Sequence, residues 1–83
     1  MDITVEKLKG MVREFFVNEY IDTVHYITAY KDDSRVDTKQ TIKCALDRVL
    51  GVVMFVQELD VPYEWVAAEY EKFKKSFENL LTN

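Results

Sequence analysis

His25 is the only histidine in this 83-residue sequence, and histidine is the residue type most suited to act as a base or metal ligand at neutral pH. Asp22 precedes it by one helical turn, where a carboxylate can orient an imidazole. Catalysis needs a nucleophile as well as a base and its orienting group, and no spacing around His25 implies a nucleophile. We therefore expect His25 to be a partly exposed helix residue and the protein not to be an enzyme.

A small-molecule pocket is the alternative function that these residues allow. Polar and aromatic side chains follow His25 along the same segment, and they can line a site inside a helical domain. The candidate pocket residues are His25, Tyr26, Tyr30 and Cys44.

Cys44 is the only cysteine, so the chain can form no internal disulfide and gives no sign of an oxidising compartment. It lies seven residues after Asp37, too deep in the expected helix for the helix dipole to activate its thiol strongly. Unpaired cysteines are often buried small hydrophobes. We predict a buried Cys44 that reacts slowly with thiol reagents, in a cytoplasmic protein.

Metal and cofactor sites are not expected. Asp32, Asp33 and Asp37 suggest calcium, but an EF-hand loop needs glycine at its sixth position and glutamate at its twelfth. Neither register, counted from Asp32 or from Asp33, supplies them. One histidine and one cysteine also fall short of the usual zinc ligand sets.

Composition indicates a single all-α domain covering residues 1–83. Hydrophobic residues make up 48% of the chain, enough for a core, while two glycines and one proline leave too few turn signals for a β fold. The net charge of −4 and the lack of a basic stripe argue against nucleic-acid binding. The longest apolar run, Val52 to Val56, is far too short for a membrane span, and the start has no signal-peptide pattern.

The strongest pattern predicts a central helix over residues 38–59, opened by Asp37 as N-cap. Its apolar positions fill about half of the helix circumference, whereas a surface helix needs a stripe only a little over ~100° wide. This helix should therefore be buried by more than one neighbour. Its two apolar rows are Ile42, Ala45, Val49, Val52, Val56 and Leu59, and Leu46, Leu50 and Val53.

The last helix is predicted over residues 62–81, with Pro62 in its first turn. The short link before Pro62 makes it an antiparallel neighbour of the central helix. Its apolar stripe is narrow, so it should cover one side of the central helix: Tyr63, Val66, Tyr70, Phe73, Phe77 and Leu80.

The first helical segment begins after Thr4, a good N-cap, and keeps one apolar face only as far as Glu19, which falls inside that face. A straight helix would place this carboxylate in its own core, unless the second half packs against a different neighbour. We favour a break or strong bend near Asn18, giving helical segments 4–17 and 20–31.

The fold predicted is a small antiparallel bundle of three to four helices, and its apolar residues exceed what such a bundle can bury. We expect a non-enzymatic accessory or regulatory protein that forms a homodimer and can also bind another protein. For Trp65 the sequence allows two roles, packing over the turn before the last helix or binding a partner. The candidate interface residues are Tyr20, Ile21, Val24, Ile27, Met54, Phe55 and Trp65.

Overall fold

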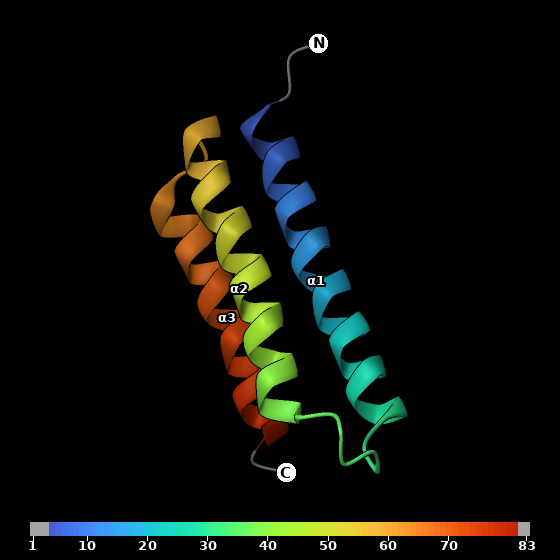
Figure 1. The fold of residues 1–83 in the computed structure, drawn as a ribbon. Helices are drawn as coiled ribbons and strands as arrows, with labels where there is room; N and C mark the ends of the chain where they lie inside the picture. The colour runs from blue at the N-terminus through green and yellow to red at the C-terminus, as the bar shows by residue number, and fades with distance from the viewer. Residues whose placement is uncertain (1–3, 82–83) are drawn as a thin grey trace.

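Three helices form an elongated antiparallel bundle in the computed structural model, which describes residues 4–81 (Figure 1). The helices are α1 (Val5–Ala29), α2 (Thr38–Val56) and α3 (Tyr63–Leu81), and a short 3-10 turn, η1 (Gln57–Leu59), extends the end of α2. The bundle measures 47 × 23 × 16 Å. The all-α class and the bundle architecture predicted from the sequence are confirmed.

Local capping explains where the first two helices begin. The Thr4 side chain accepts a hydrogen bond from the Lys7 backbone N–H at 3.1 Å, and Asp37 accepts one from the Gln40 N–H at 3.2 Å. Each bond satisfies a backbone donor that the first turn of a helix leaves without a partner. Both N-caps are confirmed.

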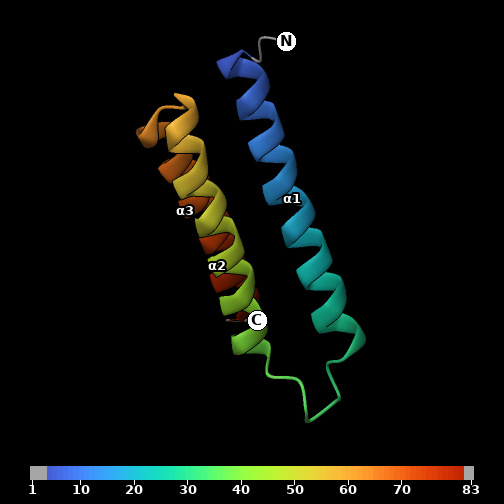
Figure 2. The same cartoon turned by 45° about the horizontal axis from the view of Figure 1, so that its top comes forward.

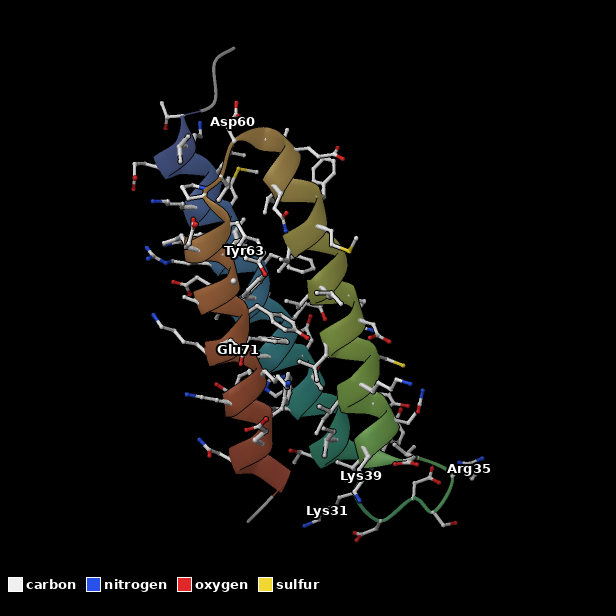
Figure 3. The ribbon with its side chains drawn as sticks, turned by 90° about the vertical axis from the view of Figure 1, so that its left-hand side faces the viewer. Lys31, Arg35, Lys39, Asp60, Tyr63 and Glu71 are labelled. Atoms are coloured by element: carbon white, nitrogen blue, oxygen red, sulfur yellow. The ribbon has the colours of Figure 1, made fainter. Side chains whose placement is uncertain are left out.

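The turn between α2 and α3 reverses the chain over a few residues. Asp60 adopts a left-handed conformation with φ of 65°, which ends η1, and Pro62 lies just before α3. Figure 3 labels Asp60 at this end of the bundle and Lys31, Arg35 and Lys39 around the α1–α2 loop at the other. The two connections make α2 antiparallel to both of its neighbours.

The predicted break in the first helix is wrong. α1 runs without interruption from Val5 to Ala29, and Figure 1 shows it as one continuous ribbon. Glu19 does lie on the side of α1 that faces α2, as the pattern indicated, but its carboxylate accepts a hydrogen bond from the Arg48 side chain at 3.0 Å. Because an arginine from α2 pairs with the carboxylate, the helix does not need to break to bring Glu19 into solvent.

The core lies where α2 contacts both other helices. α1 and α3 run parallel, with Phe16 against Phe73 and Tyr20 against Phe77 at ring-centroid distances of 5.6 and 5.2 Å. The predicted stripe of α3 supplies much of the core, although Tyr63 is exposed and the Leu80 side chain lies outside the described part. The buried apolar residues are Val12, Phe16, Ile42, Ala45, Val49, Val53, Val56, Val61, Val66, Phe73 and Phe77.

The two neighbours do not cover the whole apolar arc of α2. Leu50, Met54 and Phe55 remain exposed, and Met54 and Phe55 keep 64% and 60% of their surface accessible. Figures 1 and 2 show α1 and α3 on two different sides of α2, which leaves the rest of its circumference without a covering helix. The apolar arc of α2 is therefore partly open to solvent.

Candidate functional site

An apolar groove lies between the first half of α1 and the second half of α2. It encloses about 310 Å³, and every lining residue is apolar. The helical spacing explains this, because positions three and four apart on each helix project to the same side. We use the name apolar groove for the site lined by Leu8, Met11, Val12, Phe15, Val52, Phe55, Val56 and Leu59.

The edges of the apolar groove are unusually exposed for large apolar side chains. Met11 from α1 and Phe55 from α2 keep 53% and 60% of their surface accessible, and Leu59 is also exposed. Val12 and Val56 at the base belong to the buried core. The groove thus has a buried apolar floor and exposed apolar edges, a combination typical of interaction surfaces.

A polar pocket continues the same side of the bundle toward the α1–α2 loop. Its volume is about 350 Å³, and all of its lining residues come from α1 and α2. Arg48, which pairs with Glu19, lines the end of this pocket nearer the apolar groove. We use the name polar pocket for the site lined by Asp22, Thr23, Tyr26, Thr41, Cys44 and Arg48.

Thr23 is the unusual member of the polar pocket. It is buried, and its hydroxyl has no hydrogen-bond partner among the described residues. Most buried hydroxyl groups are paired, because leaving one unpaired costs about 1–3 kcal/mol. Thr23 therefore contributes a buried hydroxyl without a hydrogen-bond partner next to the pocket.

The structure brings together two of the four residues expected to form a small-molecule pocket. Tyr26 and Cys44 both line the polar pocket. Tyr30 packs on the Tyr26 ring at 4.9 Å but is not among the lining residues, and His25 is exposed and also absent from them. The sequence did not single out Thr41 and Arg48, whose places depend on how α2 packs against α1.

The predicted burial of Cys44 is wrong, since the thiol is exposed. Its nearest polar contact is the Gln40 side-chain amide, whose nitrogen lies 3.7 Å from the sulfur. Cys44 is at the margin of the apolar arc of α2, in the half of the helix nearer the α1–α2 loop. No helix covers that margin, so the thiol faces the polar pocket instead of the core.

Four of the seven candidate interface residues pack partly within the chain itself. Tyr20 contacts Phe77, while Val24 and Ile27 are half-buried. Trp65 packs against the core under α1, with the Lys9 ammonium and the Arg13 guanidinium over its ring at 5.3 and 5.1 Å. Ile21, Met54 and Phe55 are exposed.

Leu8, Met11, Phe15 and Leu59 of the apolar groove were not among the candidate interface residues. Their sequence spacing assigned them correctly to the faces on which α1 and α2 meet. The spacing does not show that Met11 of α1 and Leu59 of η1 remain exposed at the edge of the contact between α1 and α2. The exposed edge of a helix contact depends on the angle and depth of packing, which local spacing does not encode.

The remaining polar contacts join helices or order the loop: the Arg13 side chain of α1 donates to the Glu69 carboxylate of α3 at 3.3 Å. In the α1–α2 loop, side-chain hydrogen bonds from Arg35, followed by its backbone N–H, hold the pKa of Asp33 below its ordinary value. Within residues 4–81, no three His, Cys, Asp or Glu side chains cluster closely enough to hold a metal ion. None of the three helices, over the same range, combines the length and apolarity needed to cross a bilayer.

Comparison of this chain with protein-family models, with curated proteins and with solved structures finds no match. The function therefore has to be argued from the two sites between α1 and α2.

Proposed function

We propose that this chain is a non-enzymatic accessory or regulatory protein that acts through protein–protein contact, first of all with a second copy of itself. The observation that carries the proposal is the apolar groove, where Met11 and Phe55 remain more than half exposed beside a buried apolar floor. Contiguous apolar surface of this kind is rare on monomers unless it binds something. The proposed interface keeps Phe55 from the sequence-based candidates and adds the α1 side of the groove.

The expected affinity is moderate. Met11, Phe55 and Leu59 are each roughly half exposed, so burying the rest of each is worth about 1 kcal/mol. A two-fold contact that buries these three residues from each copy should give a dimer in the micromolar range.

The test is sedimentation equilibrium of the native chain over a micromolar concentration series, beside two matched variants. Met11→Glu places a carboxylate on the edge of the apolar groove, and should weaken self-association at least about tenfold because burying an unpaired charge is costly. Val17→Glu changes a residue of similar exposure on the same helix, 56% against 53%, outside the apolar groove, and should leave association unchanged.

Circular dichroism of both variants shows whether each is folded. A native chain that stays monomeric at high micromolar concentration contradicts self-association and leaves the apolar groove to a different protein. Equal weakening by both substitutions contradicts the choice of this groove.

Binding of a small polar molecule in the polar pocket is the second candidate function. It is favoured by a 350 Å³ pocket whose lining presents Tyr26, Cys44 and Arg48. A thermal-shift screen of polar metabolites tests it, with Tyr26→Ala as the variant that should abolish any shift. His25→Ala, outside the pocket lining, is the control that should retain it.

We also place the protein in the cytoplasm as part of this proposal. The support is the single exposed cysteine, which has no partner within the chain and is typical of a reducing compartment. Localisation of a fluorescent fusion in the native cell tests this assignment.

A further inference from the structure

Lys7 and Glu14 flank Met11 on one side of α1, four residues before it and three residues after it. All three side chains are exposed, and positions at this spacing lie next to one another on a helix surface. Within residues 4–81, neither the Lys7 ammonium nor the Glu14 carboxylate has an ion-pair or hydrogen-bond partner. Two opposite charges thus stand unpaired on either side of Met11 along the edge of the apolar groove.

The spacing of these charges matches that of a helical seam. Leu8, Met11 and Phe15 follow one another by three and four residues, and Lys7 and Glu14 each directly precede a seam position. In paired helices, charges at such flanking positions set the orientation and register of the partner. A second copy of α1 running antiparallel, centred near Met11, brings each lysine opposite a glutamate. A parallel copy in register brings lysine opposite lysine.

Phe55 lies at about the same height along the bundle as Met11, the centre of this antiparallel contact between two α1 helices. The apolar groove pairs Leu8 with the Leu59 end of α2 and Phe15 with the Val52 end, so Phe55 lies level with Met11. A two-fold axis near Met11 therefore places the two most exposed side chains of the apolar groove, Met11 and Phe55, close to the axis in both copies, where an isologous contact buries its residues most completely.

We propose that two copies of this chain associate through antiparallel α1 helices that cross near Met11, with Lys7 of each copy paired to Glu14 of the partner subunit and Phe55 of each copy packed against the partner's apolar groove. This geometry rests on the proposed self-association and specifies its orientation. The Glu19–Arg48 pair and the polar pocket then lie away from the two-fold axis and remain accessible.

The decisive test uses charge reversal, measured by sedimentation equilibrium at low salt. Lys7→Glu places two glutamates opposite each other at both ends of the contact, and Glu14→Lys does the same with lysines. Each single variant should weaken the homodimer about tenfold, since two surface pairs per dimer change from attraction to repulsion. The double variant restores opposite charges and should recover the native affinity.

Mixing the two single variants gives a second readout. One chain then carries only glutamates at these positions and the other only lysines, so the mixture should form a heterodimer tighter than either homodimer. A dimer that is insensitive to all of these changes, yet dissociated by Met11→Glu, overturns the antiparallel geometry while leaving the proposed function intact. A monomeric native chain overturns both.

Cross-linking locates the axis independently of charge. In a Cys44→Ser background, Met11→Cys puts one thiol of each copy near the proposed axis, within the ~7 Å Cα separation that a disulfide needs. Oxidation should then give a covalent dimer, while Val17→Cys in the same background should not. Equal cross-linking of both variants, or of neither, contradicts an axis near Met11.

Discussion

Glu19 on α1 and Arg48 on α2 form the ion pair that allows α1 to stay continuous. The Arg48 Nε donates to Glu19 Oε2 at 3.0 Å, and the Glu19 side chain is only 19% exposed. The carboxylate thus lies at the edge of the helix contact and not in the core. The pair lies where the α1–α2 contact changes from the apolar lining of the groove to the polar lining of the pocket.

A double-mutant cycle should detect this pair. Alanine at Glu19, at Arg48 and at both should give a coupling free energy of about 0.5–1 kcal/mol, because Glu19 is mostly shielded while Arg48 is about half exposed. Urea unfolding provides the free energies. The control cycle pairs Glu19 with exposed Lys43, where the coupling should be close to zero. Equal coupling in the two cycles would show that the Arg48 contact contributes nothing specific.

The two glycines inside helices should be replaceable with a gain in stability. A Cβ atom added at Gly10 or Gly51 would meet nothing within 4 Å. Alanine is favoured over glycine in a helix by up to ~1 kcal/mol, because glycine loses more backbone entropy on folding. Gly10→Ala and Gly51→Ala should each raise the free energy of unfolding by about 0.5–1 kcal/mol and add in the double variant. A loss of stability at either position would reveal a contact that the single chain does not make.

The sequence predicted those parts of the fold that depend on nearby residues. Thr4 and Asp37 cap their helices through bonds to residues three positions ahead, and the periodicity of α3 marks its buried face within 20 residues. The break near Asn18 was predicted wrongly because the partner of Glu19 lies 29 residues away in the chain. The residue pattern of α1 alone cannot show that Arg48 of α2 pairs with Glu19.

Burial at the margins of an apolar arc could not be predicted for a related reason. Cys44 and Phe55 belong to the apolar side of α2, yet both are exposed. Whether such a margin is covered depends on where α1 lies across α2, which the packing of many residues decides together. The candidate sites were therefore predicted less completely than the helices, since both lie along this margin.

The Asp33 carboxyl in the α1–α2 loop should titrate below the ordinary range of an aspartate. Its pKa is lowered by hydrogen bonds from the Arg35 side chain, at 2.9 Å for the closest, and from the Arg35 backbone N–H. A carboxyl with a lowered folded-state pKa favours folding above its unfolded pKa, and this contribution disappears as the pH falls through the folded value. Carbon-detected NMR titration measures it. In Arg35→Gln the pKa should rise toward the ordinary value, while Lys31→Gln should leave it unchanged.

Cys44 should react with a thiol reagent in the native protein. Its sulfur is exposed and faces a pocket, so no unfolding is required for the reagent to reach it. We expect the native labelling rate near neutral pH to lie within about one order of magnitude of the rate in denaturant. Spectrophotometric labelling with an aromatic disulfide gives both rates. A native rate limited by unfolding would mean that the thiol is covered in solution.

Thr23→Val should stabilise the protein, although it removes a polar group from the polar pocket. Valine has nearly the shape of threonine and a similar helix propensity, so the substitution changes the packing and backbone contributions to the free energy of unfolding very little. What changes is the buried hydroxyl, which has no partner among the described residues, and whose unpaired burial costs about 1–3 kcal/mol. The free energy of unfolding should therefore rise by about 1 kcal/mol.

Thr23→Ser is the matched variant, because it keeps the hydroxyl and removes only the methyl group. It should lower stability through the lost apolar contact of a buried residue. Urea unfolding of both variants separates the two contributions. If valine destabilises as much as serine does, then the Thr23 hydroxyl has a partner in solution. If valine stabilises the chain but abolishes a ligand-induced thermal shift, then the unpaired hydroxyl is retained for binding at a cost in stability, as residues in binding sites often are.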